Sequence, residues 1–508
     1  MSFCKSNNVA LWADAPQIRL LYARGMATVK LSSDTLSNLP EALHPPTYDR
    51  SAITPSIVHI GVGGFHRAHL ALYVDQLCRA GNTDWGIVGA GVMPFDEKMA
   101  EALTGQDCLY TLVSRDQDGF DANVIGSIVD FIHAYPDPQP LIDKIASPET
   151  QIVSMTVTEG GYPVDDATGE FDPDSPNASD TSAFAAIVKG LAKRMADGVG
   201  PVTIQSCDNV MGNGDVAALA TKSMAAAHGD DLVAWIEENV AFPNSMVDRI
   251  TPATTDADRE WFAENIGIED NWPVVCEPFI QWVIEDEYAG ARPPWETLDI
   301  IITEDVRPFE HMKLQLLNAG HSVLGFSSHQ FEIELVHDGM ADPDVLSFVE
   351  AYLHREAKTS LHPVEGMDFD AYIESLLERF ANPQVRDQIL RLAMDGTGRL
   401  PKFALPTLRT HLENGGPTKL AGLLLACWCQ CLTGKSDAGN DIEYGPDAML
   451  DEAKAAAQAS LENPAAFLDL APTFDGIREN EAFVAEFVET LTAVRENGLR
   501  ATIQSYVA

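Results

Sequence analysis

Basic residues are scarce in this chain of 508 residues. Lys and Arg number 33 against 76 Asp and Glu, which gives a formal net charge of −43. A surface of that sign repels the phosphates of nucleic acids and the anionic headgroups of membranes. We therefore expect no nucleic acid and no membrane as partners. We interpret the dispersed acidic residues as a strongly solvated surface, with a salt-rich host as the alternative.

Long hydrophobic runs are also missing. No stretch reaches the roughly 20 apolar residues that a membrane-spanning helix needs, and residues 1–25 lack the apolar core and cleavage site of a signal peptide. Eight cysteines are too few for a disulfide framework in a chain of this length, and a reducing compartment would keep them as thiols. These absences predict a cytoplasmic protein.

One group of cysteines superficially resembles a metal cluster. Cys427, Cys429 and Cys431 alternate in LLLACWCQCL. Alternate residues of a helix point about 200° apart, and no second group of Cys or His lies nearby in the sequence. Because free cysteine packs as a small hydrophobe, we expect these residues in a helical core. His66 and His69 lack a matching carboxylate, so we expect no metal site there either.

The chain changes character near residue 303. Before it, short β-branched runs such as SIVHIGVG (56–63), WGIVGAGV (85–92) and LDIIIT (298–303) alternate with helical patterns, which favours a parallel sheet covered by helices on both faces. After it the strand pattern fades and helical periodicity dominates. Helices are predicted at 309–328, 343–355, 369–380, 383–394, 417–432, 447–461 and 480–498.

Two domains are expected because a single core stops growing at about 250–300 residues. Pro293 and Pro294, in YAGARPPWETLD (288–299), stop a helix and suit a linker between them. The predicted parts are an N-terminal extension, disordered in part, over 1–45, an α/β domain over 46–302 and a mostly α-helical domain over 303–508.

Glycines stand between a strand and a helix in IVHIGVGGFHRAH (57–69). A dinucleotide-binding fold needs a tight turn at this place, with the helix N-terminus facing the pyrophosphate. The third glycine of G-x-G-x-x-G is replaced by His66, so a turn that binds another ligand is the alternative. The predicted cofactor-binding residues are Ile60, Gly61, Val62, Gly63, Gly64, Phe65, His66 and Arg67.

An acidic residue is expected near the end of the second strand, where it would bind the ribose hydroxyls of adenosine. Asp96, or Glu97 beside it, occupies that position. A carboxylate there repels a 2′-phosphate, so we predict NAD rather than NADP as the cofactor. Lys98 and Arg115 are the nearby cations that argue for NADP.

The stretch EHMKLQLLNAGHS (310–322) mixes polar and apolar residues on one helix face. Glu310, Lys313, Asn318 and His321 share an arc with leucines, which is typical of a pocket wall. Burial would lower the pKa of the lysine and provide a neutral amine as a general base. The alternative is a lysine that extends to solvent beside a hydrogen-bonded core histidine.

Several segments, in order, resemble the polyol-specific long-chain dehydrogenases and reductases, the family that includes mannitol 2-dehydrogenase. The resemblance runs from about residue 45 to the C-terminus. It rests on HIGVGGFHRAH (59–69), TEGGY (158–162), SCDN (206–209), FPNSMVDRITP (242–252), WPVVCEPFIQWVIED (272–286), PFEHMKLQLLNAGHS (308–322) and RLPKFALPT (399–407).

This resemblance implies a Rossmann-type N-terminal domain, a helical C-terminal domain, a cleft between them and no catalytic zinc. It implies Lys313 as the general base, with Asn209 and Asn318 holding the reacting oxygen. By the same resemblance His321 orients the substrate and Glu310 passes the proton of the lysine to solvent.

The resemblance also implies substrate-binding residues. Asp248 corresponds to an acidic residue that supports the base, and Arg391 to a substrate-binding arginine. Arg399 stands where mannitol-type members are expected to carry lysine, which leaves the far end of the substrate open.

The function expected from all of this is NAD-dependent oxidation of an acyclic polyol to a ketose, with D-mannitol and D-fructose as the first choice, in a monomer. Fructuronate reduction and arabinitol oxidation are the alternatives within the family. A catalytically inactive nucleotide-binding protein and a zinc-dependent alcohol dehydrogenase are the alternatives outside it.

Overall fold

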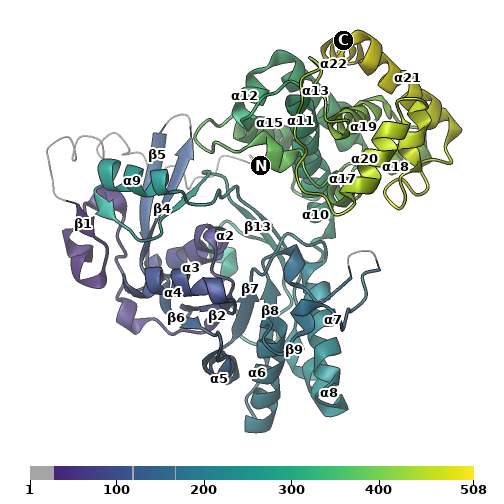
Figure 1. Cartoon of the computed structure of the whole chain (residues 1–508). Coiled ribbons are helices and arrows are strands. Elements are labelled where there is room, and N and C mark those ends of the chain that lie inside the picture. The colour runs from purple at the N-terminus through teal and green to yellow at the C-terminus, as the bar shows by residue number, and fades with distance from the viewer. Residues whose placement is uncertain (1–27, 117–118, 166–167) are drawn as a thin grey trace. The chain divides into compact units, whose positions relative to one another are not determined.

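The computed structural model describes residues 28–116, 119–165 and 168–508. The described chain divides into two compact units between Arg307 and Pro308, an N-terminal unit and a C-terminal unit (Figure 1). The expectation of disorder in the N-terminal extension falls largely on residues outside the described ranges. The described part of that extension contains one short strand, β1 (Val29–Lys30), and 3-10 turns.

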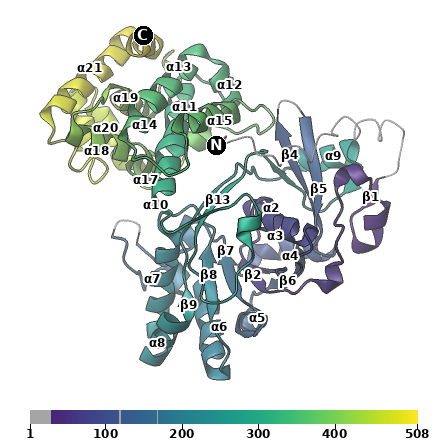
Figure 2. The ribbon, with the colours of Figure 1, turned by 180° about the vertical axis from the view of Figure 1, so that it is seen from behind.

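A six-stranded sheet forms the centre of the N-terminal unit. All neighbouring strands are parallel, in the order β6-β3-β2-β7-β8-β9 (Figures 1 and 2). Counted along the chain this order is 3-2-1-4-5-6, that of the Rossmann fold, so the predicted fold class is confirmed. The strands are β2 (Ile57–Ile60), β3 (Ile87–Gly91), β6 (Ile128–His133), β7 (Ile152–Met155), β8 (Val202–Ser206) and β9 (Val240–Ala241).

Helices cover both faces of this sheet because its strands alternate between two cores. Ile57 of β2 packs into one core with helix α3, whereas Val58 and Ile60 pack into the other with α5 and α6. Both sets of residues are apolar, as expected for a sheet buried on both faces. The helices are α2 (Gly64–Ala68), α3 (Leu70–Arg79), α4 (Glu97–Thr104), α5 (Gln139–Ala146), α6 (Ala183–Asp197), α7 (Asn213–Ala226), α8 (Asp230–Asn239) and α9 (Asp256–Asn265).

Two smaller three-stranded sheets complete the unit. Their orders are β10-β13-β14 and β12-β4-β5, and β1 pairs with β11. The expected linker at 288–299 is wrong, because Trp295 is fully buried in the core of this unit and β14 follows it. The strands are β4 (Tyr110–Asp116), β5 (Gly119–Ile125), β10 (Ser245–Asp248), β11 (Ile268–Glu269), β12 (Val274–Cys276), β13 (Gln281–Glu285) and β14 (Ile301–Thr303).

The C-terminal unit is helical in its described residues, and α11 packs against several neighbours, including α13, α16 and α19. The helices are α10 (Arg307–Lys313), α11 (Ala319–Gln330), α12 (Val336–Ala341), α13 (Pro343–Tyr352), α14 (Lys358–Ser360), α15 (Phe369–Phe380), α16 (Ile389–Leu392), α17 (Gly396–Phe403), α18 (Leu405–Asn414), α19 (Lys419–Leu432), α20 (Leu450–Ala459), α21 (Glu481–Asn497) and α22 (Leu499–Val507).

Three expectations for this unit need correction. The helix expected at 383–394 is reduced to α16, because Gln388 bridges to Leu335 in extended conformation. Helices α12, α17, α18 and α22 were not expected. Pro401 lies inside α17, where proline disfavours a helix, whereas Pro406 lies in the first turn of α18, where proline is tolerated. The helix expected at 309–328 is interrupted by a π turn.

Cys427, Cys429 and Cys431 are fully buried in α19, which confirms their expected place in a helical core. Within the described residues no group of His, Cys, Asp and Glu could hold a metal ion. None of the helices in the described ranges is long and apolar enough to cross a membrane.

Candidate functional site

The glycine turn begins where the chain leaves β2. Gly61 has a φ of +91°, which favours glycine, and a Cβ there would lie 2.0 Å from the carbonyl oxygen of Thr156. At Gly63 a Cβ would meet nothing within 4 Å, and α2 begins at the next residue. The strands on either side of β2 are β3 and β7, so the turn lies at the point where the strand order reverses, the ligand-binding position of such sheets.

His66 and Arg67 follow the turn but are each only 1% exposed. The ring of His66 stacks on that of His59 with centroids 3.4 Å apart. Burial lowers the pKa of His59 to about 3 and, with the charge of His59, holds the pKa of His66 well below its usual value. Nε of Arg67 donates to the carbonyl oxygen of Gly63 at 3.2 Å. What these two residues present to the turn is therefore their main chain.

Asp96 lies at the same edge of the sheet as the glycine turn. The N–H of Gly61 donates to the carbonyl oxygen of Ala90 in β3 at 2.9 Å, and a Cβ on Gly91 would lie 2.4 Å from Cβ of Asp96. The Asp96 carboxylate accepts a hydrogen bond from the N–H of Met93 at 2.9 Å. Arg115 is one of the two cations that argued for NADP, but its guanidinium stacks on Trp261 at 3.8 Å.

Asn209 extends from the carboxyl end of β8 and is exposed. The residue before it, Asp208, is buried and accepts hydrogen bonds from the N–H of Thr158 at 2.7 Å and the hydroxyl of Tyr162 at 2.8 Å. These bonds fasten the loop that carries Asn209 to the loop after β7. Both loops belong to the edge of the sheet that holds the glycine turn.

Asp248 ends strand β10 and is only 4% exposed. Its strand is joined to the Asn209 loop through Asn213, whose Nδ2 donates to the carbonyl oxygens of Asp208 at 3.0 Å and Ser245 at 2.8 Å. The N–H of Ser245 donates in return to Oδ1 of Asn213 at 2.9 Å. The two candidate substrate-binding segments of this unit are therefore held together by one buried amide.

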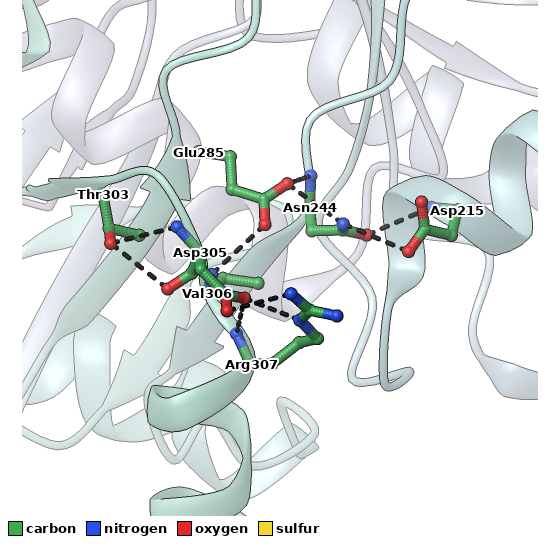
Figure 3. Close-up of polar contacts among 7 residues, drawn as sticks. All are labelled: Asp215, Asn244, Glu285, Thr303, Asp305, Val306 and Arg307. Atoms are coloured by element: carbon green, nitrogen blue, oxygen red, sulfur yellow. Dashed lines mark hydrogen bonds and ion pairs between the residues drawn. The ribbon is translucent and has the colours of Figure 1, made fainter. Parts of the chain in front are cut away.

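A second polar network connects β10 to the end of the unit (Figure 3). One oxygen of Glu285 accepts hydrogen bonds from the N–H and Nδ2 of Asn244, both at 3.0 Å, and the other accepts from the N–H of Val306 at 3.2 Å. Asp305 accepts from the N–H of Arg307 at 3.1 Å and so caps the start of α10. Glu285 thus fixes the backbone immediately before the helix that carries Lys313.

The lysine helix places four predicted residues on one continuous element of the C-terminal unit. Glu310 is 4% exposed and Lys313 7% exposed, while Asn318 and His321 are half-buried. The ring of His321 lies 4.3 Å from that of Phe380. The lysine also has apolar neighbours in the sequence, because Leu314, Leu316 and Leu317 are all buried.

The prediction from sequence assumed a regular helix with 100° per residue, but the helix is not regular throughout. Leu314–Asn318 form a π turn, and the N–H of Ala319 donates to the carbonyl oxygen of Leu314 five residues earlier. One residue more per turn rotates everything after Leu314 relative to Lys313. Such turns are frequent at functional sites.

Arg391 and Arg399 lie on α16 and α17, and α16 packs against α11 while α17 packs against the π turn. Nε of Arg391 donates to Asp387 at 2.7 Å, and Nη1 of Arg399 donates to the carbonyl oxygen of Arg391 at 2.7 Å. Burial alone would raise the pKa of Asp387, but the bonds and charge of Arg391, together with His321, lower it. The predicted residues of the C-terminal unit thus form one neighbourhood.

The predicted residues therefore fall into two groups, one in each unit. The glycine turn, Asp96, Asn209 and Asp248 belong to the N-terminal unit, and the lysine helix and the two arginines to the C-terminal unit. The sequence reasoning missed two residues that hold parts of these groups in place, Asn213 and Glu285. Glu285 lies within a segment that carries the family resemblance, and this was the available signal.

Comparison with known proteins identifies family models over most of the chain. The model described as the mannitol dehydrogenase Rossmann domain matches residues 55–297. The model described as the mannitol dehydrogenase C-terminal domain matches residues 305–495.

Individual proteins match over a similar length. A mannitol 2-dehydrogenase of Phaeosphaeria nodorum is 40% identical over 94% of this chain and 86% of its own length. The solved ternary complex of Pseudomonas fluorescens mannitol 2-dehydrogenase with NAD and D-mannitol is 38% identical, with a TM-score of 0.84, and covers 94% of this chain and 99% of that one. A substrate-free D-sorbitol dehydrogenase is 34% identical, with a TM-score of 0.86, and covers 93% of this chain and 100% of that one.

Proposed function

We propose that this chain, which belongs to the mannitol dehydrogenase family, uses NAD to oxidise a secondary alcohol of an acyclic polyol to a ketose, with D-mannitol as the substrate and D-fructose as the product. The observation that carries this proposal is the likeness, over 94% of the chain, to the solved complex with NAD and D-mannitol. The reaction converts alcohol and NAD⁺ into ketone, NADH and a proton, and it is reversible.

The N-terminal unit fits NAD in its described residues. Gly61 adopts the left-handed backbone and the close approach that a dinucleotide turn needs. Asp96 stands at the end of the neighbouring strand, where its carboxylate can accept hydrogen bonds from ribose hydroxyls and would repel a 2′-phosphate. When bound, NAD would accept the hydride from the carbinol carbon.

Lys313 is the proposed general base. Its amine would take the proton of the substrate hydroxyl, and Asn209 and Asn318 would donate hydrogen bonds to the oxygen as negative charge develops on it. Glu310, one helical turn before the lysine, would pass the proton on to solvent. Asp248 is the acidic residue that would support the base.

The remaining contacts concern substrate orientation. We assign His321 to a substrate hydroxyl and Arg391 and Arg399 to the hydroxyls further along the chain. Since Arg391 is already paired with Asp387, its free donors are fixed in direction before substrate arrives. In this proposal the lysine removes the hydroxyl proton, a step that a metal can assist by binding the substrate oxygen, and no metal is required.

D-sorbitol is a second candidate substrate. The observation that favours it is the likeness to the D-sorbitol dehydrogenase structure. D-mannitol and D-sorbitol differ in configuration at one carbon and give the same ketose when that carbon is oxidised. The choice therefore depends on how the site holds the reacting hydroxyl.

An assay of polyols, ketoses and uronates with NAD and NADP, followed by absorbance of the reduced cofactor, tests the proposal. We expect the highest kcat/KM with D-mannitol and NAD, and full activity after treatment with a chelator. Turnover of fructuronate alone would assign the chain to the uronate reductases, and turnover of D-sorbitol in preference to D-mannitol would select the second candidate.

We also propose that the enzyme acts as a monomer in the cytoplasm. The cysteines in the described ranges are all buried free thiols, which suits a reducing compartment. Sedimentation of the purified chain with and without NAD tests the monomer.

A further inference from the structure

A buried amide lies inside the π turn of the lysine helix. Gln315 is 7% exposed, two residues after Lys313, and Thr407 is fully buried in α18. The hydroxyl of Thr407 donates to Oε1 of Gln315 at 3.0 Å. The hydroxyl of Ser360 lies 2.9 Å from the same oxygen and 2.8 Å from the carbonyl oxygen of Ala357, its second acceptor. We call Gln315, Ser360 and Thr407 the hydroxyl clamp.

The clamp joins two irregular turns of the C-terminal unit. Ser360 follows a second π turn, Leu353–Ala357, in which the N–H of Lys358 donates to the carbonyl oxygen of Leu353. The two π turns pack against each other, and a Cβ on Gly320 would lie 3.3 Å from a methyl group of Leu353. Each π turn contains one residue more than an α turn, and the two π turns therefore lie at the same contact between helices.

The π turn decides which residues share a face with Lys313. An α turn closes on the fourth residue and a π turn on the fifth. Asn318 is five residues after Lys313, so the π turn returns it to the lysine side of the helix. A regular α-helix would place the two residues about 140° apart around the axis. The pairing of base and amide thus depends on a backbone feature that has poorer intrinsic stability than the α-helix.

We infer that Gln315 is a positioning residue, which together with Ser360 and Thr407 holds the π turn that sets Lys313 and Asn318 side by side. This inference rests on the proposed function, in which those two residues act on one substrate oxygen. A buried acceptor costs free energy unless it is satisfied, and here the hydroxyls satisfy it only when the π turn is in register. The clamp therefore selects the π turn over the regular helix.

The test removes the clamp without changing its volume. Gln315→Met deletes the acceptor, Thr407→Val deletes a donor, and Thr407→Ser restores a hydroxyl. Thr502→Val is the matched control, because Thr502 is also a buried threonine of this unit and bonds only to the carbonyl oxygen of Gly498 among the described contacts. Each variant is assayed for kcat, KM for D-mannitol, NAD affinity by NADH fluorescence, and melting temperature.

The expected result is a fall of about 10²-fold in kcat for Gln315→Met and Thr407→Val, the loss that misplacement of a reacting group by about 1 Å produces. NAD affinity should be unchanged, and Thr407→Ser should recover most of the activity. A double variant of Gln315 and Thr407 should lose no more than Gln315→Met alone, because that variant already removes the acceptor of both the Thr407 and the Ser360 hydroxyls.

Two outcomes would overturn the inference. The first is a lowered melting temperature with kcat retained, which would make the clamp a structural contact only. The second is an equal loss of kcat in Thr502→Val, which would make the effect one of general packing. Failure of the proposed function is separate, since the unchanged chain would then fail to oxidise D-mannitol and Lys313→Ala would change nothing.

Discussion

Asn213 and Ser245 bind each other with two hydrogen bonds across the N-terminal unit. The N–H of Ser245 donates to Oδ1 of Asn213 at 2.9 Å, and Nδ2 of Asn213 donates to the Ser245 carbonyl oxygen at 2.8 Å. Since Nδ2 also donates to the carbonyl oxygen of Asp208, one side chain connects the loop of Asn209 to the strand of Asp248. The arrangement needs an acceptor and a two-proton donor in one planar group, which is what an amide provides.

The amide of Asn213 can be tested by its isosteric replacement with a carboxylate. Asn213→Asp turns a donor into an oxygen that faces two carbonyl oxygens, so we expect a loss of about 1–3 kcal/mol in the free energy of unfolding. We also expect a lower kcat with D-mannitol. Urea unfolding and steady-state kinetics measure both.

The control for that variant is Asn239→Asp. Among the described contacts, Asn239 donates only to the carbonyl oxygen of Trp235 within its own helix, so its replacement should leave kcat unchanged. Equal effects of the two replacements on kcat would show that Asn213 has no special connection to the site.

Lys313→Ala tests the proposed base. General acid–base catalysis contributes about 10²–10⁴-fold, so kcat should fall by that amount at neutral pH, while NAD binding, assigned to the other unit, should survive. A largely retained turnover at neutral pH would remove Lys313 from its role. Added small amines provide a further check, because they should restore part of the rate at high concentration.

Asp96→Ala concerns cofactor choice. Removal of the carboxylate should raise kcat/KM with NADP and lower it with NAD, and a change of about 1.4 kcal/mol corresponds to tenfold in their ratio. Parallel assays with the two cofactors measure this ratio. Glu97→Ala is the matched control, and a larger change in the ratio there would assign the role to Glu97 instead.

Because the pKa of Glu356 is raised, we predict that the stability of the C-terminal unit depends on pH. Burial raises the pKa of this carboxyl from 4.5 to about 7, although its oxygens accept hydrogen bonds from the N–H groups of Leu420 and Ala421 at 2.7 and 2.8 Å. The folded chain therefore binds more protons than the unfolded chain between these values. The contribution of Glu356 to the free energy of unfolding is fully present below about pH 4.5. It is lost as the pH rises through 7, and the loss is about 3 kcal/mol at most.

Glu356→Gln should remove that dependence. Relative to the variant, the unchanged chain should lose unfolding free energy as the pH rises from 5 to 8, as measured by denaturant titration. Glu350→Gln, an exposed replacement on the preceding helix, should give curves parallel to the unchanged chain. Parallel curves for Glu356→Gln would contradict the raised pKa.

Local pattern was sufficient to predict the class of each unit. The β-branched runs of 56–63 and 85–92 became parallel strands, and the alternation of Ile57 and Val58 between two cores follows from the period of a strand. The glycine turn was predictable for a similar reason, since the left-handed backbone at Gly61 is a property of one residue.

Contacts between distant segments account for what was missed. Trp295, in a segment rich in proline, is buried by residues that lie far away in the sequence, so composition alone predicted a linker there. Helix α17 contains Pro401, and neighbouring helices stabilise it against its own propensity. The π turn likewise depends on Ser360 and Thr407, which lie 45 and 92 residues from Gln315.

The sequence by itself determined the two classes of unit and the position of the glycine turn, because these depend on residue type and local period. The tertiary structure alone decided the register of the lysine helix, the joining of the Asn209 and Asp248 segments and the burial of Glu356. Each of these depends on a hydrogen bond or a packing contact between residues remote in the chain, and no local pattern records such a partner.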